Sequence, residues 1–171
     1  YTLNWSRLND PIEPSRGYRL QFSQGFAGIG GDVRYVRSEI EGAIYRPVLP
    51  RLFDNNIVAS FTMNGGFVQP WGGDTVRIND RFFKGGNSFR GFEVAGIGPR
   101  IVTRNAETGE LNRGDALGGR LYAVGAFEVS FPTGLPEQYG VRASVFTEFG
   151  TLGLLDTPDQ IDEGAAGTAF T

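Results

Sequence analysis

The residues of this chain that could carry chemistry are two glutamates and one arginine. Glu128 and Glu148 fall on the polar side of two consecutive segments in which apolar and polar residues alternate, so we expect the two carboxylates to lie near each other. Two facing carboxylates repel each other unless a cation lies between them. Arg90 is the natural candidate for this cation, because one guanidinium can donate hydrogen bonds to two acceptors at once.

Arg90 lies in a glycine-rich segment, residues 82–100, where the alternating pattern stops. Its glycines indicate a backbone that needs positive φ or a close approach to another segment. The segment also carries Phe82, Phe83, Phe89 and Phe92, which a solvated loop would not keep exposed. We therefore expect the loop to fold against a surface that supplies an acidic partner for the arginine, since an unpaired buried charge is costly.

Two other interpretations of the glutamate pair are open. Paired carboxylates at a separation of about 5–10 Å serve glycosidases, although nothing else in the sequence indicates a sugar-binding cleft. The two side chains could also simply line a wet interior. The chain has no Cys and no His, which excludes disulfides, thiolate chemistry, the usual zinc sites and any nucleophile–histidine–acid triad. We expect no enzymatic activity.

No cofactor and no metal ion is expected either. The glycines at 25–31 superficially resemble a phosphate-binding loop, but they lie between two strand-like segments with no helix after them. The acidic residues of the C-terminal region lack the ligand spacing of a calcium loop; they are Asp156, Asp159, Asp162 and Glu163. A net charge of −3 and a pI near 5.0 argue against a nucleic-acid partner.

The elements that must position these residues are predicted to be β-strands. Alternation of apolar and polar residues predicts about six of them, at residues 1–8, 18–26, 33–46, 56–68, 117–131 and 141–152. Short and longer connections alternate between them, which favours an all-β, antiparallel up-and-down meander. Several of these strands are long for a globular sheet, where about 5–6 residues is typical.

The two faces of the predicted sheet differ in charge. One is rich in Arg and Glu, and the other is nearly free of charge. Because a mid-membrane Arg or Lys on a lipid-facing strand costs roughly 2–4 kcal/mol, this segregation fits a transmembrane β-barrel with an apolar outside and a wet lumen. A soluble β-sandwich with one buried face produces the same alternation, so the pattern alone favours neither.

The segment FF-x-GG-x-x-x-RGF followed by GPR resembles the long loop of the BamA superfamily of outer-membrane protein assembly factors. In that family the loop folds back into the barrel lumen. The residues that carry the resemblance are Gly85, Gly86, Phe89, Arg90, Gly91, Phe92, Gly98 and Pro99. The position before the arginine is usually Val in the family and is Phe89 here.

The resemblance implies that the Arg90-Gly91-Phe92 tip docks on the inner wall of the barrel. Its implied wall partners are Glu128, Phe146 and Glu148, with the Phe146 ring able to stack on the guanidinium. The last position is usually Asp in the family, so the hydrogen-bond geometry at Glu148 differs by one methylene.

The resemblance also implies how the chain is organised. Residues 1–171 are expected to form part of an outer-membrane β-barrel domain, its middle-to-late strands, with a long inward-folded loop at about 70–116 and a truncated loop at 156–171. No signal peptide begins at Tyr1 and about six strands cannot close such a barrel, so we expect further strands and periplasmic POTRA domains outside this chain. Made alone, the fragment is expected to hide its sheet edges by self-association, because open edges are untenable in lipid.

The function that the resemblance implies is the folding and insertion of other outer-membrane proteins. The expected partners are outer-membrane lipid, nascent outer-membrane proteins and the lipoproteins of an assembly complex, and the expected location is the outer membrane of a Gram-negative bacterium. Within the superfamily, a TamA-like protein or a two-partner-secretion translocator is the alternative. From other classes, the alternatives are a passive porin and a soluble β-sandwich that binds a ligand or cleaves glycosides.

Overall fold

The structure is a computed structural model that describes residues 1–171 apart from residues 29, 31–32, 49–56, 106–108, 134–140 and 156–171. The predicted truncated loop at 156–171 lies outside the described residues, as do parts of the connections that follow the predicted strands at 18–26, 33–46 and 117–131. In the part of the chain that is described, no helix has both the length and the apolar character needed to cross a membrane.

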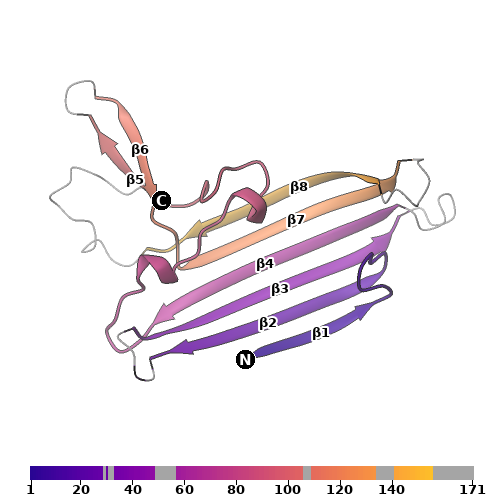
Figure 1. The fold of residues 1–171 in the computed structure, drawn as a ribbon, viewed down its shortest axis with the longest axis horizontal. Coiled ribbons are helices and arrows are strands. Elements are labelled where there is room, and N and C mark those ends of the chain that lie inside the picture. The colour runs from indigo at the N-terminus through magenta and orange to yellow at the C-terminus, as the bar shows by residue number, and fades with distance from the viewer. Residues whose placement is uncertain (29, 31–32, 49–56, 106–108, 134–140, 156–171) are drawn as a thin grey trace. The chain divides into compact units, whose positions relative to one another are not determined.

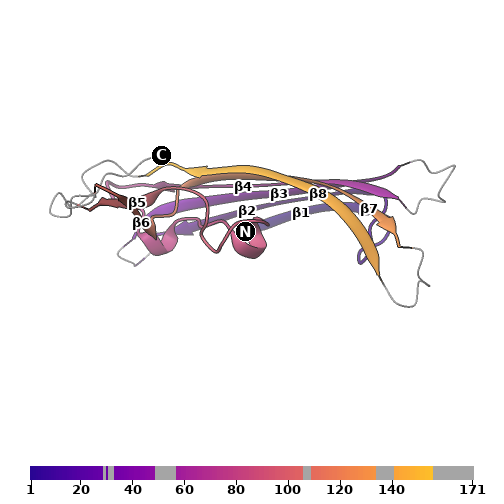
Figure 2. The same cartoon turned by 90° about the horizontal axis from the view of Figure 1, so that it is seen from above.

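Six strands form one sheet in the order β1-β2-β3-β4-β7-β8, which can be followed in Figure 1; Figure 2 shows the same strands from above. Their bounds are β1 Thr2–Leu8, β2 Gly17–Ala27, β3 Tyr35–Pro47, β4 Val58–Pro70, β7 Leu121–Pro132 and β8 Arg142–Gly153. Each strand pairs with its neighbour in the chain, except that the long loop separates β4 from β7. The predicted all-β, antiparallel meander is confirmed.

The loop between β4 and β7 contains secondary structure that the sequence analysis did not predict. Two 3-10 turns, η1 (Ile78–Asp80) and η2 (Gly86–Ser88), precede a two-stranded antiparallel hairpin of β5 (Arg100–Arg104) and β6 (Leu111–Ala116). The described residues therefore contain about eight strands rather than about six. The hairpin was missed because β6, with the sequence LNRGDA, shows no alternation of apolar and polar residues.

The register of β1 and β2 explains why these segments form strands with two different faces. Apolar residues lie opposite each other in the pairs Leu3↔Phe22 and Trp5↔Leu20, and polar residues lie opposite each other in the intervening pairs. Because the side-chain period of a strand is two, a slip of one residue would move the whole apolar set to the other face. The alternation thus fixes the register as well as the secondary structure.

The described residues bury few apolar side chains and expose many. The buried hydrophobic side chains are Ala43, Val58, Val68, Val76, Phe82, Phe89, Tyr122, Val124 and Leu152. Large apolar residues of the strands stay exposed, such as Trp5 at 50%, Val145 at 67% and Phe149 at 56%. So much exposed apolar surface is unusual for a soluble monomer and typical of strands that face lipid.

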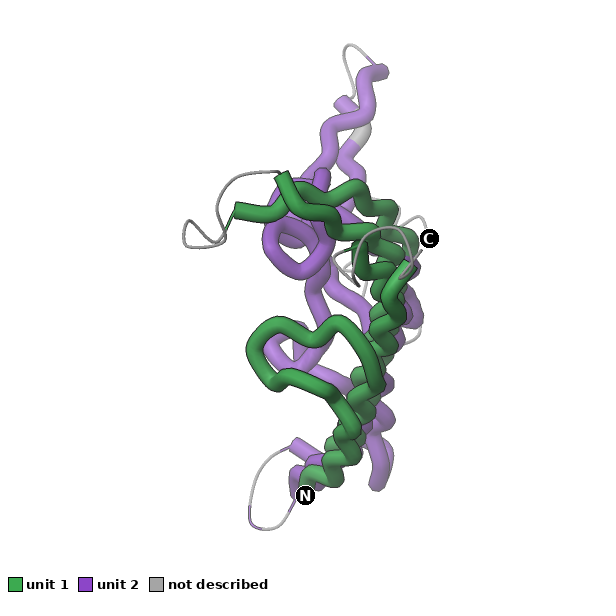
Figure 3. Tube along the Cα trace, turned by 90° about the vertical axis from the view of Figure 1, so that its right-hand side faces the viewer, with its two compact units in different colours: residues 1–23, 39–65, 124–149 green, residues 24–38, 66–123, 150–171 purple. Residues whose placement is uncertain are grey.

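The chain divides into two compact units (Figure 3). Unit 1 comprises Tyr1–Ser23, Glu39–Gly65 and Val124–Phe149, and it holds β1 with parts of β2, β3, β4, β7 and β8. Within it, the rings of Phe61 and Phe149 stack at 6.4 Å between centroids. Gly125 of β7, the strand between β4 and β8, leaves room for the Phe149 ring.

Unit 2 comprises Gln24–Ser38, Gly66–Ala123 and Gly150–Thr171. It holds the whole of the long loop together with the strand segments from which the loop leaves and to which it returns. The glycine-rich segment that the sequence analysis singled out lies entirely in this unit.

Candidate functional site

The predicted site residues fall in both units. The eight loop residues, Gly85, Gly86, Phe89, Arg90, Gly91, Phe92, Gly98 and Pro99, belong to unit 2. The three predicted wall partners belong to unit 1, with Glu128 in β7 and with Phe146 and Glu148 in β8. Each of these three, like Arg90, takes part in at least one side-chain or backbone interaction. The pairing of Arg90 with the wall residues stays a prediction.

The loop is fastened at Phe82, which is 4% exposed. Its backbone forms a two-way bridge with Gly119, through N–H···O distances of 2.8 and 2.9 Å. Its ring meets the ring of Tyr122 edge-on, at 4.7 Å between centroids and an angle of 67°. The Arg37 guanidinium carbon lies over the same ring at 4.2 Å from its centroid. The Phe82 ring is thus held by an aromatic contact with β7 and a cation–π contact with β3.

Gly66 of β4 provides the space for this aromatic pair. A Cβ at position 66 would collide with the ring of Tyr122 and would come within 2.8 Å of the Phe82 ring. Both rings therefore pack directly against the backbone of β4 at Gly66. A glycine inside a strand, which lowers strand propensity, is here a packing requirement.

Lys84 makes a second attachment to the same wall residue. Its ammonium nitrogen lies 3.8 Å from the centroid of the Tyr122 ring. Its carbonyl accepts a hydrogen bond from the N–H of Ile97 at 3.4 Å, which draws the two ends of the glycine-rich segment together. Tyr122 thus contacts two loop residues, Phe82 and Lys84, from β7.

The turn at Gly85 and Gly86 needs glycine for two reasons. Gly85 has φ 139° and ψ 179°, a conformation that essentially only glycine adopts, and a Cβ there would collide with the carbonyl oxygen of Glu93. The Gly86 N–H donates to the carbonyls of Phe92 and Glu93, at 2.9 and 3.1 Å. The Ser88 hydroxyl closes the turn by bonding with both backbone groups of Gly85. This turn sets the direction of the Arg-Gly-Phe tip.

At the tip, two phenylalanines flank the arginine. Phe89 is 5% exposed, and its ring lies 5.0 Å from that of Phe92. Arg90, which lies between them in the sequence, is exposed. Gly91 has φ 87°, and the space around its Cβ position is open. The two rings thus contact each other on either side of Arg90 in the sequence.

The segment meets β8 at Gly98 and the chain before β7 at Pro99. Gly98 has φ 100°, and a Cβ there would come within 2.6 Å of the Leu152 side chain. The carbonyl of Pro99 accepts a hydrogen bond from the N–H of Leu117 at 2.9 Å. Gly98 of the predicted Gly-Pro pair therefore allows close contact with the buried Leu152 of β8, while Pro99 accepts a backbone hydrogen bond.

Several residues that anchor the loop were not predicted from the sequence. The Tyr35 hydroxyl bonds with Asp80 at 3.0 Å, and Arg81 donates to the backbone carbonyls of Val76 and Leu117 at 3.2 and 3.3 Å. Tyr122, Gly66, Lys84 and Arg37 were also missed as anchors. A signal was present for two of them: an aromatic residue, Tyr122, on the polar side of its strand, and a glycine, Gly66, inside an otherwise regular strand.

All of these contacts are non-covalent, and together they hold an arginine-bearing loop against its strands. Backbone bridges, aromatic edges and cations over rings fasten the segment at Phe82, Lys84 and Gly98. Such a device positions a charged tip.

Comparison with known proteins gives a consistent result. The family model described as Omp85 superfamily domain matches residues 1–168. The chain is 36% identical over 152 residues to the outer membrane protein assembly factor BamA of Neorickettsia risticii. The aligned region covers 89% of this chain and 19% of that protein. The chain is 35% identical over 126 residues to the human sorting and assembly machinery component 50 homolog, which covers 72% of this chain and 24% of that protein.

A solved structure has a similar fold. BamA from Haemophilus ducreyi lacking POTRA domains 1–3 superimposes with a TM-score of 0.73 over 88% of this chain and 29% of that one, at 22% sequence identity. The chain thus spans only 19% to 24% of the length of the two curated relatives named above.

Proposed function

Because the chain belongs to the Omp85 superfamily, we propose that it forms part of the barrel of an outer-membrane protein assembly factor, a protein that folds and inserts other β-barrel proteins. The observation that carries this proposal is the identity of 36% to a protein named as an assembly factor over 89% of the chain. The names of the two curated relatives described above contain the word assembly, which favours this function over a secretion translocator. Bond chemistry is not part of the proposed role.

The proposed location is the outer membrane of a Gram-negative bacterium. The coarser location, an outer membrane, follows from the family. The bacterial assignment is supported by the larger share of the chain matched by the bacterial relative, 89% against 72% for the human one. The proposed partners are outer-membrane lipid, nascent outer-membrane proteins and the lipoproteins of an assembly complex.

The contribution of this chain to assembly is to hold the Arg90 tip against the inner wall. Strand alternation supports the assignment of the wall residues. Tyr122 contacts the loop, and Glu128 follows it on β7 by an even number of residues, so a regular strand points both side chains to the same face. The same rule gives Phe146 and Glu148 the face of Leu152, the β8 residue that meets Gly98.

The proposal is tested by Arg90→Ala in the full-length protein. Loss of the guanidinium leaves the two acids without their cation, so we expect the loop to become protease-accessible and outer-membrane protein levels to fall, with most strands intact. Arg113→Ala is the matched control, because Arg113 is an exposed arginine of the same loop, in β6. Unchanged accessibility and unchanged protein levels for Arg90→Ala would contradict the role.

A second set of variants separates the wall from the tip. Glu128→Gln and Glu148→Gln should each loosen the loop less than Arg90→Ala does, because one carboxylate remains for the arginine. The double variant should match Arg90→Ala, and adding Arg90→Ala to it should have no further effect, which is the signature of residues that act as one unit. Additive losses in the triple variant would contradict the pairing and leave the assembly function itself untouched.

A further inference from the structure

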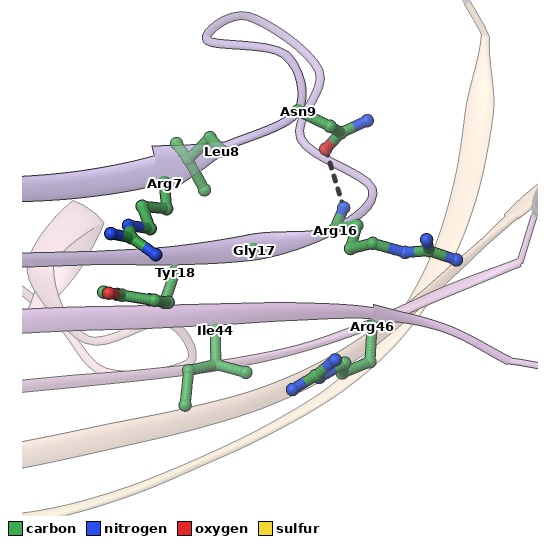
Figure 4. A pocket seen from close by; sticks show the side chains of 8 residues that line it. All are labelled: Arg7, Leu8, Asn9, Arg16, Gly17, Tyr18, Ile44 and Arg46. Atoms are coloured by element: carbon green, nitrogen blue, oxygen red, sulfur yellow. Dashed lines mark hydrogen bonds between the residues drawn. The ribbon is translucent and has the colours of Figure 1, made fainter.

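A hollow of about 540 Å³ lies at the end of the β1–β2 hairpin, beside β3 and inside unit 1 (Figure 4). Three arginines line it: Arg7 from β1, Arg16 from the hairpin connection and Arg46 from β3. Tyr18 and Ile44 supply its apolar walls. No residue that lines the hollow carries a negative charge.

The arginines stand at the end of the exposed apolar face. Arg7 is paired with Tyr18 in the register, and the pair before it on that face is Trp5↔Leu20, so the four side chains share one face of the β1–β2 ladder. On β3, Arg46 follows Ile44 by two residues and therefore shares its face. The face thus changes from apolar residues to a tyrosine and arginines within one step along each strand. This is the composition expected where a membrane-facing strand leaves hydrocarbon for the headgroups.

Hydrogen bonds and a close backbone contact hold the connection that carries Arg16. The side-chain oxygen of Asn9 accepts hydrogen bonds from the N–H groups of Ser15 and Arg16, at 3.1 and 2.8 Å. Gly17 has φ 117°, and a Cβ there would collide with the carbonyl oxygen of Arg7. The backbone positions of Arg7 and Arg16 are therefore held before any ligand arrives, which lowers the entropic cost of binding.

The arginines of the hollow have no ion-pair partner among the described residues. Among these, Arg7, Arg16 and Arg46 form no ion pair, whereas the neighbouring Arg19, which points to the other face of β2, binds Glu41 at 2.6 Å. Three like charges around one hollow attract an anion, and a guanidinium matches the oxygens of a phosphate especially well. The wall formed by Trp5, Leu20 and Ile44, which are 50%, 37% and 49% exposed, suits acyl chains beside that anion.

We propose that this hollow binds the headgroup phosphate of an anionic phospholipid, with the acyl chains along the apolar face of β1, β2 and β3. The site requires that the strands lie in a membrane, but it does not depend on the role proposed for Arg90. A defective Arg90 tip would leave lipid binding unchanged, so the two proposals fail separately.

The test is a lipid titration of the full-length protein in detergent, followed by native mass spectrometry. Dioleoylphosphatidylglycerol is the anionic probe and dioleoylphosphatidylcholine the zwitterionic one. We expect Arg7→Gln/Arg46→Gln to weaken phosphatidylglycerol binding about twentyfold, and the triple variant with Arg16→Gln on the order of a hundredfold, from the usual contribution of one basic residue near anionic lipid. The charge-matched control is Arg19→Gln/Arg113→Gln, which should bind within about twofold of the unsubstituted protein.

Two further measurements control for misfolding of the variants and for binding of a free phosphate in place of a lipid. The triple variant Arg7→Lys/Arg16→Lys/Arg46→Lys keeps the charge and should bind within about fivefold of the unsubstituted protein; a loss as large as that of the glutamine triple would point to damage of the hairpin and overturn the proposal. Inorganic phosphate and glycerophosphoglycerol should not compete at the lipid concentrations used. Competition by either, or equal binding of the zwitterionic lipid, would overturn the assignment to an anionic lipid.

Discussion

The ring of Phe149 on β8 lies against the bare backbone of Gly125 on β7, so closely that a Cβ at position 125 would come within 2.5 Å of the ring. Phe61 of β4 stacks on the same ring from the other side of β7. Glycine weakens an isolated strand, but here Gly125 makes room for an aromatic side chain that contacts residues of both β4 and β7. The same arrangement recurs in unit 2, where Tyr122 rests on Gly66.

Substitution of Gly125 should destabilise the strands through overpacking. Gly125→Ala is expected to lower the free energy of unfolding by about 1–3 kcal/mol, because the new methyl group and the Phe149 ring cannot occupy the same space. Equilibrium unfolding of the full-length protein in urea measures the effect. Gly25→Ala is the control, since Gly25 lies in β2 with nothing within 4 Å of its Cβ position. In the double variant Gly125→Ala/Phe149→Ala the clash is gone, so a penalty equal to the sum of the single variants would contradict this account.

Truncation of Tyr122 should release the loop without unfolding the sheet. Tyr122→Ala removes the ring that Phe82 and Lys84 contact, and we expect the loop attachment to weaken by about 2 kcal/mol or more. The N–H of Phe82 donates to the carbonyl of Gly119, and the N–H of Gly119 donates to the carbonyl of Phe82, so hydrogen exchange at these two amides reports the attachment directly. Phe131→Ala, an exposed position on the same strand, should leave both amides protected. Equal exchange in the two variants would show that the aromatic contact is not the anchor.

Two glycines of the loop should differ in their tolerance of alanine. Gly85→Ala meets both a forbidden backbone conformation and a collision with the Glu93 carbonyl, whereas Gly91→Ala meets only an unfavourable φ of 87° in open space. We expect Gly91→Ala to cost about 1 kcal/mol and Gly85→Ala several times that. Limited proteolysis of the loop in the full-length protein compares them. The reverse order of sensitivity would mean that the turn at 85–88 does not set the loop conformation.

The β1–β2 connection should loosen in acid. Hydrogen bonds from the N–H groups of Glu13 and Ile12 hold the pKa of Asp10 below its ordinary value of 3.8. A lowered folded-state pKa stabilises the turn above the ordinary pKa, and this contribution is lost as the pH falls through the folded value. Hydrogen exchange of the Ile12 and Glu13 amides, corrected for intrinsic rates, should therefore rise below about pH 4. The Arg16 amide, bonded to the non-titrating Asn9, is the internal reference.

Asp10→Asn provides the matched variant for this pH dependence. An asparagine oxygen still accepts both hydrogen bonds but does not titrate. The exchange of the two amides should then be independent of pH over the same range. A persistent acid response in the variant would assign the loosening to another group.

Comparison of sequence and structure shows which physical signals were sufficient. Alternation over long strands predicted the six-stranded meander. Successive side chains of a strand point to opposite faces, so a strand with one apolar face shows alternating apolar and polar residues in its sequence. The Arg-Gly-Phe segment predicted the family, which the match over residues 1–168 confirms, and the fold likeness to a BamA barrel favours this over a soluble β-sandwich. Both signals are local in sequence.

The anchors were harder to predict because they depend on pairs that are distant in sequence. Nothing near Phe82 says that its ring will meet Tyr122 over Gly66, since that contact is created by the neighbouring positions of β4 and β7 after the loop has been formed. The β5–β6 hairpin was missed for a different reason, as its residues lack a buried face that would impose alternation. The docking of Arg90 on Glu128, Phe146 and Glu148 stays a prediction.

The crowding at Gly66 has an evolutionary corollary. The rings of Tyr122 and Phe82 both occupy the space beside the α-carbon of Gly66. A residue with a side chain can therefore replace Gly66 only after both aromatic residues have been replaced by smaller ones. If the codon is randomised in a selected library, glycine should be the only survivor. The other residues of β4 that face away from these rings should drift freely among apolar alternatives.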